Sequence, residues 1–461
     1  MPSQPGSSDR SATLADPVLA RSALAGSVAI LILAGLLGGA LGSVAKAACR
    51  AGAWNVGVEQ YQAHCYTDIY PLYFAEGLAK GQVPYFDHHV EYPVVMGAVM
   101  QAAAWVSGPA DTSLAGREFY DVTVALLAFC LVAGVLATAY CAGRSRRWTG
   151  LLVALSPALI LAAFINWDLI AMALTMSALA AWAARRPVLA GVLLGLAVAT
   201  KFYPVICLLP LFALCLRAGR LRPFWLAAGS ALAAWLVVNL PVAVAATAGW
   251  ERFYIFNATR GADWGSIWYF FQTEHWPVVG GVSLSAMNLT SALLFLAACI
   301  AIGVLAVAAP RRPRLPQLLF LATAAFLLAN KVWSPQYVVW LVPLVVLARP
   351  RLGAYVAWQI AEVGYFYAIW GYLITVVAGP QTSGAVSPGL YFAALLARFG
   401  TVVLLCVLVV RDILRPGRDV VRADGETDDP AGGVLDGSPD RFLLRLGARP
   451  GRSQPGPAAV S

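Results

Sequence analysis

Long runs of apolar residues recur between residues 23 and 410 and are separated by short polar joints. A helix needs roughly 17–25 apolar residues to cross the hydrocarbon core of a membrane, whereas barrel strands would alternate polar and apolar positions. These runs are rich in Ala, Leu and Val and do not alternate, so they predict an all-α polytopic membrane protein with about twelve transmembrane helices. The predicted helices are 23–44, 119–142, 149–165, 169–184, 188–201, 204–216, 224–248, 285–308, 316–330, 337–348, 353–378 and 391–410.

The charged joints between these runs predict the topology. Basic clusters recur after every second predicted helix and contain Arg144, Arg146, Arg147, Arg185, Arg186, Arg217, Arg220, Arg222, Arg311, Arg312, Arg314, Arg349 and Arg351. The positive-inside rule places these clusters, and with them both termini, in the cytoplasm. This arrangement requires that one further apolar run, 92–107, lies in the interface or dips in and returns. The sequence therefore predicts a first outer loop at 46–118 and a second long outer loop at 249–284.

Composition agrees with a membrane protein and bounds its domains. The chain has 461 residues, of which 60% are hydrophobic and 12% charged, which is too apolar for a soluble globule. Its net charge of +9 resides in short clusters between the helices, so it does not indicate nucleic acid. The polar segments 1–20 and 412–461 are predicted to be disordered and cytoplasmic, which leaves 21–411 as the membrane domain.

The first outer loop gathers acids and histidines in a chain that is otherwise poor in charge, which suggests chemistry at the membrane surface. Asp68 lies in this loop among tyrosines such as Tyr66 and Tyr70. Partial burial beside the rings would raise the pKa of this carboxylate and suit it to act as a general base. Thr67 and Asp68 are also good N-cap residues for the following helix, so a capping role is the alternative.

A cluster of polar residues later in the same loop consists of Asp87, His88, His89 and Glu91. These ligand types suit a metal, but their spacing matches no tight motif. An interfacial loop with incidental histidines is the other interpretation, and no metal or cofactor is predicted. Cys49 and Cys65 flank the start of the loop and could form a disulfide if it is outside, although spacing alone does not fix the geometry.

Three isolated cations, Lys201, Arg260 and Lys331, fall on the predicted outer side, against the positive-inside trend. Each alone is consistent with a snorkelling anchor, whereas together they suggest a site for an anion such as a lipid phosphate. The segment around Asp263 and Trp264 is dense in aromatic residues, which stack on sugars but also form ordinary interface belts.

Two opposite charges, Glu362 and Arg398, fall near the middle of the last two predicted helices. Charges within the membrane are costly and usually paired. We therefore expect these residues to pair with each other or to face a polar cavity, as a structural ion pair rather than as catalytic groups.

Several short motifs follow one another on the predicted outer side, from the first loop to the tenth helix. They are Asp68-Ile-Tyr, Gly81, Pro84-Tyr85, Glu91-Tyr92-Pro93, Asn166-Trp167-Asp168, Lys201-Phe202-Tyr203-Pro204, Arg260 with Asp263-Trp264 and Trp268-Tyr269, and Ser334-Pro335-Gln336-Tyr337 with Trp340 and Pro343. In these motifs the chain resembles the C-superfamily of integral-membrane glycosyltransferases. The closer resemblance is to glycosyltransferase family 87, the polyprenol-phosphate-mannose-dependent mannosyltransferases of actinobacteria.

The resemblance implies a fold, a reaction and a set of site residues. The C-superfamily glycosyltransferase fold has juxtamembrane helices in the first outer loop. The implied reaction is an inverting single displacement at the extracytoplasmic face of the plasma membrane. The donor would be a polyprenyl-phosphate sugar, with mannose as the family expectation, and the acceptor a glycolipid or polysaccharide. Asp68 would deprotonate the acceptor hydroxyl, and Lys201 and Arg260 would hold the departing phosphate. The expected substrate-binding residues are Tyr85, Asp87, Glu91, Asp168, Lys201, Tyr203, Arg260, Asp263, Trp264, Lys331 and Gln336.

Two other interpretations remain open at this point. A secondary transporter would also have twelve helices, and Glu362 with Arg398 could gate it. Against a transporter, the polar residues gather in one long loop, and the two halves of the chain show no symmetry. A non-catalytic scaffold for envelope assembly is the third interpretation. The sequence leaves the acceptor and the donor sugar open.

Overall fold

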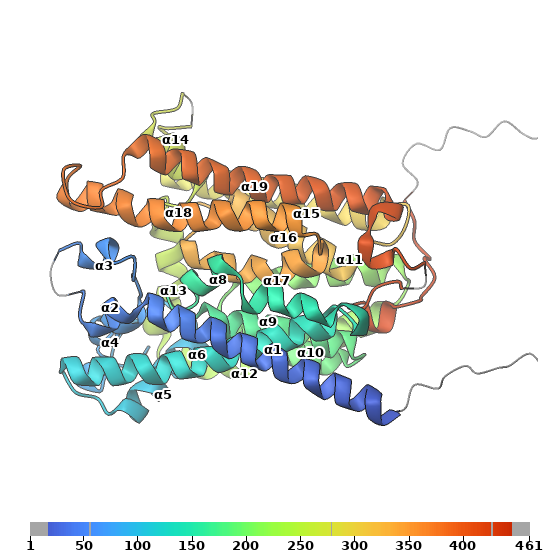
Figure 1. Ribbon diagram of the computed structural model, residues 1–461, viewed down its shortest axis with the longest axis horizontal. Helices are drawn as coiled ribbons and strands as arrows, with labels where there is room; N and C mark the ends of the chain where they lie inside the picture. The colour runs from blue at the N-terminus through green and yellow to red at the C-terminus, as the bar shows by residue number, and fades with distance from the viewer. Residues whose placement is uncertain (1–16, 55–56, 278, 426, 445–461) are drawn as a thin grey trace, which may run out of the picture.

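The computed structural model describes residues 17–54, 57–277, 279–425 and 427–444, and within these ranges the protein is helical and has no β-strand (Figure 1). The α-helices are α1 (Pro17–Ala45), α2 (Ala47–Ala51), α3 (Glu59–Gln62), α4 (Ile69–Ala75), α5 (Val94–Ser107), α6 (Ser113–Cys141), α7 (Gly150–Ala154), α8 (Pro157–Ala162), α9 (Asp168–Ala183), α10 (Pro187–Thr200), α11 (Leu208–Arg217), α12 (Leu221–Ala245), α13 (Thr247–Thr259), α14 (Ile267–Thr273), α15 (Leu284–Ala308), α16 (Leu315–Ala329), α17 (Val338–Ala348), α18 (Leu352–Ala378) and α19 (Pro388–Leu414).

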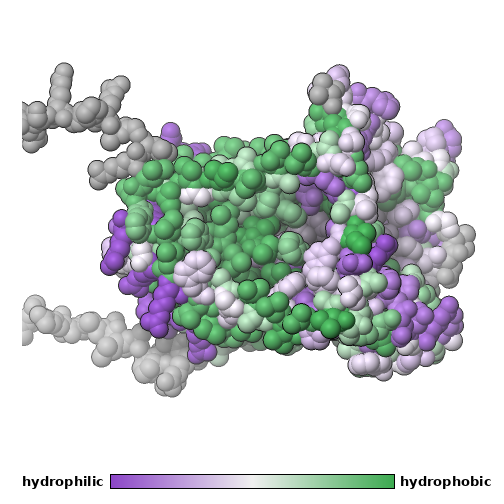
Figure 2. All heavy atoms as spheres, turned by 180° about the vertical axis from the view of Figure 1, so that it is seen from behind, coloured by the Kyte–Doolittle hydropathy of each residue, from purple (hydrophilic) through white to green (hydrophobic). Residues whose placement is uncertain are grey.

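The long apolar runs form the helices of a multi-pass membrane protein, as the sequence predicts. In the described part of the chain, six helices are long and apolar enough to cross a membrane, namely α1, α6, α12, α15, α18 and α19. Shorter apolar helices, among them α9, α10 and α16, pack between them. In Figure 2 apolar side chains cover the middle of the visible face, and polar side chains gather towards its two ends. This is the surface expected of a bundle whose middle contacts lipid.

Two of the predicted apolar segments do not form long straight helices. The predicted span 149–165 is broken into α7 and α8, since the Ser156 hydroxyl accepts a hydrogen bond from the backbone N–H of Leu159 and Pro157 occupies the first helical position. A Ser-Pro pair starts a new helix because serine caps it and proline lacks the N–H that would continue the old one. The run 92–107 forms α5, whose 14 residues extend about 21 Å, less than the roughly 30 Å of a hydrocarbon core. The placement of α5 in the interface, or as a segment that dips in and returns, stays a prediction.

The two ends of the bundle differ. At one end, here called the loop end, lie α2, α3, α4 and α14, and the first and last described residues lie at the opposite end, here called the tail end (Figure 1). The predicted basic clusters share the tail end, where Arg217, Arg312 and Arg349 each pair with an aspartate of the C-terminal segment. These three predicted clusters therefore lie at the same end of the bundle, and their cytoplasmic placement stays a prediction.

The predicted disorder of the C-terminal tail is wrong for residues 412–444, which fold against the tail end. Asp419 is buried and accepts from Arg314 at 2.7 Å, and Asp428 accepts from Arg312 at 3.2 Å. The polar composition of the tail suggested disorder, but its aspartates are the counter-charges that the basic clusters need. Of the other residues predicted to be disordered, 17–20 belong to α1, and 1–16 and 445–461 lie outside the described residues.

Candidate active site

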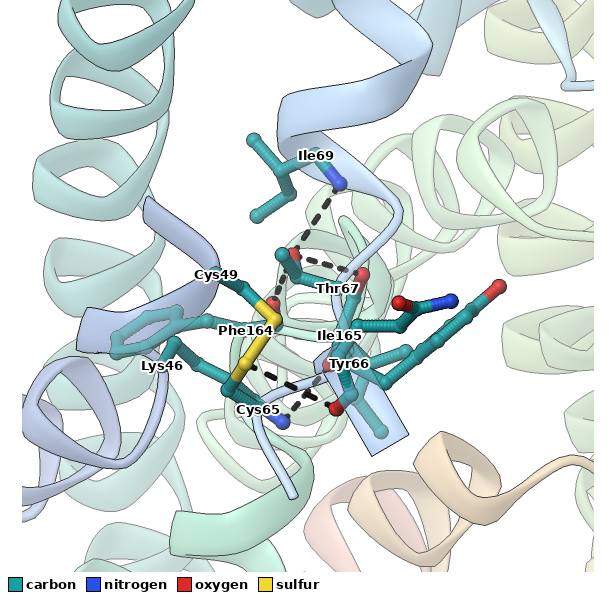
Figure 3. The surroundings of a disulfide bond; sticks show 9 residues. Lys46, Cys49, Cys65, Tyr66, Thr67, Ile69, Phe164 and Ile165 are labelled. Atoms are coloured by element: carbon teal, nitrogen blue, oxygen red, sulfur yellow. Dashed lines mark hydrogen bonds between the residues drawn. A yellow bond between two sulfur atoms is a disulfide. The ribbon is translucent and has the colours of Figure 1, made fainter. Parts of the chain in front are cut away.

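A disulfide and a buried lysine hold the start of the first loop at the loop end. Cys49 of α2 and Cys65 are bonded, which realises the pairing that the sequence left open. Beside them the Lys46 ammonium donates a hydrogen bond to the carbonyl oxygen of Tyr66 at 2.9 Å (Figure 3). Burial lowers the pKa of Lys46 to about 7, and the charge of Asp68 acts in the opposite direction. The segment that carries Asp68 is thus fixed to the end of α1.

Thr67, the residue before Asp68, anchors the same segment from the other side. Its hydroxyl donates to the carbonyl oxygen of Phe164 at 2.7 Å and accepts from the backbone N–H of Ile69 at 3.2 Å (Figure 3). The Asp68 backbone N–H in turn donates to the carbonyl oxygen of Ile165 at 2.6 Å. The capping bond at the start of α4 therefore comes from Thr67, which leaves the Asp68 carboxylate for another use.

The Asp68 side chain lines a cavity of about 490 Å³, here called the central cavity. The structure brings seven of the predicted site residues to its wall, namely Asp68, Glu91, Lys201, Arg260, Asp263, Trp264 and Gln336. They come from the first loop, the end of α10, the segment between α13 and α14, and the turn before α17. Residues far apart in the sequence thus meet in one concave site, which is where binding and catalysis are expected.

The environment of Asp68 suits a general base. The pKa of Asp68 is raised to about 6, mainly by burial and in smaller part by the charge of Asp168. The hydrogen bond from Tyr66 and the charges of Lys201 and Lys46 oppose this rise. A carboxylate with this pKa is mostly ionised at neutral pH, yet it accepts a proton more readily than an ordinary aspartate.

Lys201 enters the cavity as half of a buried ion pair. Its ammonium lies 2.9 Å from the Asp168 carboxylate, and the two side chains are 14% and 2% exposed. The ammonium also lies 5.5 Å from the ring centroids of Tyr92 and Tyr337. Asp168, predicted to bind substrate, does not line the central cavity and instead pairs with Lys201, which does. Tyr203, also predicted to do so, stacks on Trp340 with ring centroids 4.1 Å apart.

Arg260 and Asp263 also line the central cavity. The Arg260 guanidinium lies 3.4 Å from the Asp263 carboxylate, which also accepts from the Ser334 hydroxyl at 3.1 Å. The Lys331 ammonium donates to the carbonyl oxygens of Ala258 and Arg260, at 3.2 and 2.8 Å. Lys331 thereby holds the segment that presents Arg260, and it lines a neighbouring groove instead of the central cavity.

Two residues predicted to bind substrate have structural contacts outside the central cavity. The buried Tyr85 hydroxyl donates to the carbonyl oxygen of Pro93 at 2.7 Å, close against Gly97. The Asp87 carboxylate accepts from the backbone N–H of Val83 at 2.9 Å. Both side chains stabilise the turn between α4 and α5.

The predicted pair between Glu362 and Arg398 forms within the bundle. The Arg398 guanidinium donates to the Glu362 carboxylate at 2.9 Å and to the carbonyl oxygen of Trp333 at the same distance. Since Glu362 also accepts from the Trp358 indole at 3.0 Å, both charges are satisfied. The pair joins α18 to α19 and to the loop that carries Ser334.

Sequence reasoning missed three features of the site. Lys46 follows the first apolar run on the predicted outer side, so the argument that singled out Lys201 would also have found it. Trp370 stacks on Tyr66 and Tyr61 with centroids 4.6 and 5.8 Å apart, but nothing in its apolar helix marks it. Glu76 lines both the central cavity and a second cavity beside it, which a sequence cannot show. In the described ranges, no three His, Cys, Asp or Glu side chains come together as metal ligands would.

Comparison with known proteins gives one family and two similar structures. Residues 91–335, more than half of the chain, match the model of glycosyltransferase family 87. The archaeal oligosaccharyltransferase AglB from Archaeoglobus fulgidus, in complex with an inhibitory peptide and a dolichol-phosphate, is 11% identical with a TM-score of 0.38, covering 92% of this chain and 61% of that chain. The oligosaccharyltransferase of the same organism in the apo form is 12% identical with a TM-score of 0.35, covering 92% and 62%. The chain thus spans about three fifths of these structures. Among curated proteins, none matches the sequence.

Proposed function

We propose that this chain, which belongs to glycosyltransferase family 87, transfers mannose from a polyprenyl-phosphate donor to an envelope glycolipid or polysaccharide acceptor. That it is a membrane glycosyltransferase follows from the family and from the apolar helices. The observation that carries the rest of the proposal is the central cavity, which the base candidate Asp68 lines together with the cations Lys201 and Arg260.

An aromatic groove beside the central cavity fits the lipid part of such a donor. This groove has a volume of about 250 Å³ and shares Lys201 and Tyr337 with the central cavity. Its other lining residues include Phe202, Phe326 and Trp340, together with Lys331. Aromatic and apolar walls suit an isoprenoid chain, and the lysines suit the phosphate that joins this chain to the sugar. The groove would therefore deliver the sugar into the central cavity.

The reaction then needs one proton transfer and one displacement. The acceptor hydroxyl gives its proton to the Asp68 carboxylate while its oxygen forms a bond to C1 of the donor sugar. The bond from C1 to the phosphate oxygen breaks, and the polyprenyl phosphate leaves with the electron pair. Lys201 and Arg260 stabilise the departing anion, which is the larger contribution expected at such a site. Base catalysis adds roughly 10²–10⁴-fold. A single displacement inverts the configuration at C1.

Two features support placing this site at the outer face. The loop end carries the Cys49–Cys65 disulfide, and disulfides persist in oxidising compartments. The basic clusters lie at the tail end, which the positive-inside rule assigns to the cytoplasm. Together they support a donor that is loaded from the outer leaflet.

The test is sugar transfer by membranes that contain the protein. Labelled polyprenyl-phosphate mannose is the donor, and the wild type is compared with Asp68→Asn and with Asp111→Asn, a matched control at an exposed aspartate of the same loop. We expect transfer by the wild type and the control and its loss in Asp68→Asn. Equal transfer by all three would contradict the assigned base. If another polyprenyl-phosphate sugar is transferred and the mannose donor is not, that sugar replaces mannose in the proposal. If no such donor is turned over, the proposal is refuted.

A further inference from the structure

A second cavity of about 530 Å³ opens beside the central cavity and is here called the side pocket. Its lining residues are Ala75, Glu76, Asp87, His88, His89, Glu91 and Arg252. We propose that the side pocket binds the acceptor, and that this acceptor is a hydroxyl-rich glycan without a phosphate group on the sugar that enters it. This inference rests on the proposed function and names the acceptor class of the same site.

The side pocket is continuous with the catalytic cavity. Glu76 and Glu91 line both of them. Glu76 follows the last residue of α4, and Asp68 precedes its first residue, Ile69. The eight residue steps from Asp68 to Glu76 place their Cα atoms about 12 Å apart along the axis. A short oligosaccharide can span this distance, so a glycan with its attacking hydroxyl at Asp68 would place a following sugar against Glu76.

The charged side chains of the pocket are suited to hydroxyl groups. The Glu76 carboxylate lies 3.1 Å from the His88 imidazole, and the Glu91 carboxylate lies 2.7 Å from the Arg252 guanidinium. Each carboxylate has about four acceptor positions, so one partner leaves several for the hydroxyls of a sugar. The side chains of Glu91, His88 and Arg252 are 34%, 37% and 42% exposed, so a ligand can reach them.

Charge and polarity distinguish this pocket from the aromatic groove. The side pocket has three carboxylates, from Glu76, Asp87 and Glu91, against one guanidinium and the imidazoles of His88 and His89. Ala75 is the one apolar side chain among the described residues that line it. An isoprenoid chain has no apolar wall to bind there, and a phosphate would face carboxylates of like charge. The lipid-phosphate donor therefore belongs in the groove, and a glycan without phosphate belongs in the pocket.

The test compares two acceptor probes, an octyl α-mannotrioside and the same trioside with a 6-phosphate on a sugar that follows the attacking one. Each is supplied with labelled polyprenyl-phosphate mannose to the full-length protein in membranes. The variants are Glu76→Gln and Arg252→Gln, with Glu274→Gln as a control at an exposed acid of the same end. Release of mannose from the donor into water, without any acceptor, is measured in parallel as a readout that does not depend on acceptor binding.

We expect the wild type to prefer the unphosphorylated probe by at least about tenfold in kcat/KM, which corresponds to about 1.4 kcal/mol. Burial raises the pKa of Glu76 to about 7, so the carboxyl is only partly ionised at neutral pH. Glu76→Gln removes this partial negative charge and two acceptor positions, so it should raise the KM for this probe and reduce the preference. Arg252→Gln removes the positive charge, so it should increase the preference. Release of mannose into water should be unchanged in the control Glu274→Gln, whose side chain lines neither cavity.

Three outcomes would overturn the inference. One is equal use of the two probes by the wild type, and another is a KM for Glu76→Gln equal to that of Glu274→Gln. A shift of the preference in the same direction in both pocket variants would indicate general distortion instead of charge recognition. Absence of donor turnover in the wild type would instead refute the proposed function itself, and this inference with it.

Discussion

Replacement of Asp68 by asparagine should abolish transfer and yet stabilise the protein. The amide keeps the shape of the side chain and can still accept a hydrogen bond from Tyr66, but it cannot take up a proton. The rate should fall by about 10²–10⁴-fold, the range that a general base contributes. Replacement of a residue that only stabilises the fold would destabilise the protein. A loss of rate together with a gain of stability therefore distinguishes a catalytic role from a structural one.

The size of the stabilisation follows from the pKa of Asp68. Burial is the main cause that raises this pKa from 3.8 to about 6. The folded chain therefore holds the proton more tightly than the unfolded chain, and the ionised side chain costs stability above pH 3.8. The cost is complete above about pH 6, where it amounts to about 3 kcal/mol. Asp68→Asn removes this cost, so its advantage should be largest at neutral pH and should vanish below about pH 4.

The assay follows both effects on the same purified proteins. Transfer from labelled polyprenyl-phosphate mannose gives the rate, and thermal unfolding in detergent from pH 4 to pH 8 gives Tm. The transfer rate of the wild type should also rise with pH through about 6 as Asp68 ionises. A rate loss of less than about tenfold, or a Tm for Asp68→Asn at or below that of the wild type at pH 7, would refute the reasoning.

Three further substitutions test the residues that hold the site in place. Cys65→Ser opens the disulfide across a separation of 16 residues, which should lower the free energy of unfolding by about 3 kcal/mol. Dithiothreitol should lower the Tm of the wild type by a similar amount and leave the Tm of the variant unchanged. Lys201→Met leaves Asp168 buried without its partner, so it should cost about 3–5 kcal/mol, and addition of Asp168→Asn should recover most of the loss of Tm without restoring transfer. Arg398→Met should cost a similar amount by isolating Glu362, yet leave the KM for the donor unchanged; a large rise in that KM would show that this pair contacts substrate.

The apolar pattern predicted the helices well because burial in a membrane leaves few alternatives to a helix. The basic joints also predicted which segments share an end. The break of the span 149–165 was missed, although Ser156 and Pro157 signal it, because hydropathy averages over a few polar positions. The ordered tail was missed for a different reason, since the partner of Asp419 is an arginine more than a hundred residues earlier.

The candidate site was partly predictable because charged residues are rare in this chain. Lys201 and Arg260 stand out because an isolated cation on the outer side needs an explanation, and both reach the central cavity. Tyr85 matched a family motif, but its hydroxyl bonds the backbone of its own turn. Whether a polar residue faces a cavity or a neighbouring carbonyl depends on how the loops pack, which local sequence does not determine. The role of Glu76 between two cavities was hidden in the same way.

The folded C-terminal segment has a practical consequence for handling this protein. Arg217, Arg312 and Arg314 find their counter-ions in the chain itself, so they do not depend on anionic headgroups for neutralisation. Detergent extraction should therefore leave this end of the molecule intact, whereas truncation near residue 411 would strip the arginines of their partners. An affinity tag or fluorescent reporter is best fused after residue 444, where it leaves these ion pairs undisturbed.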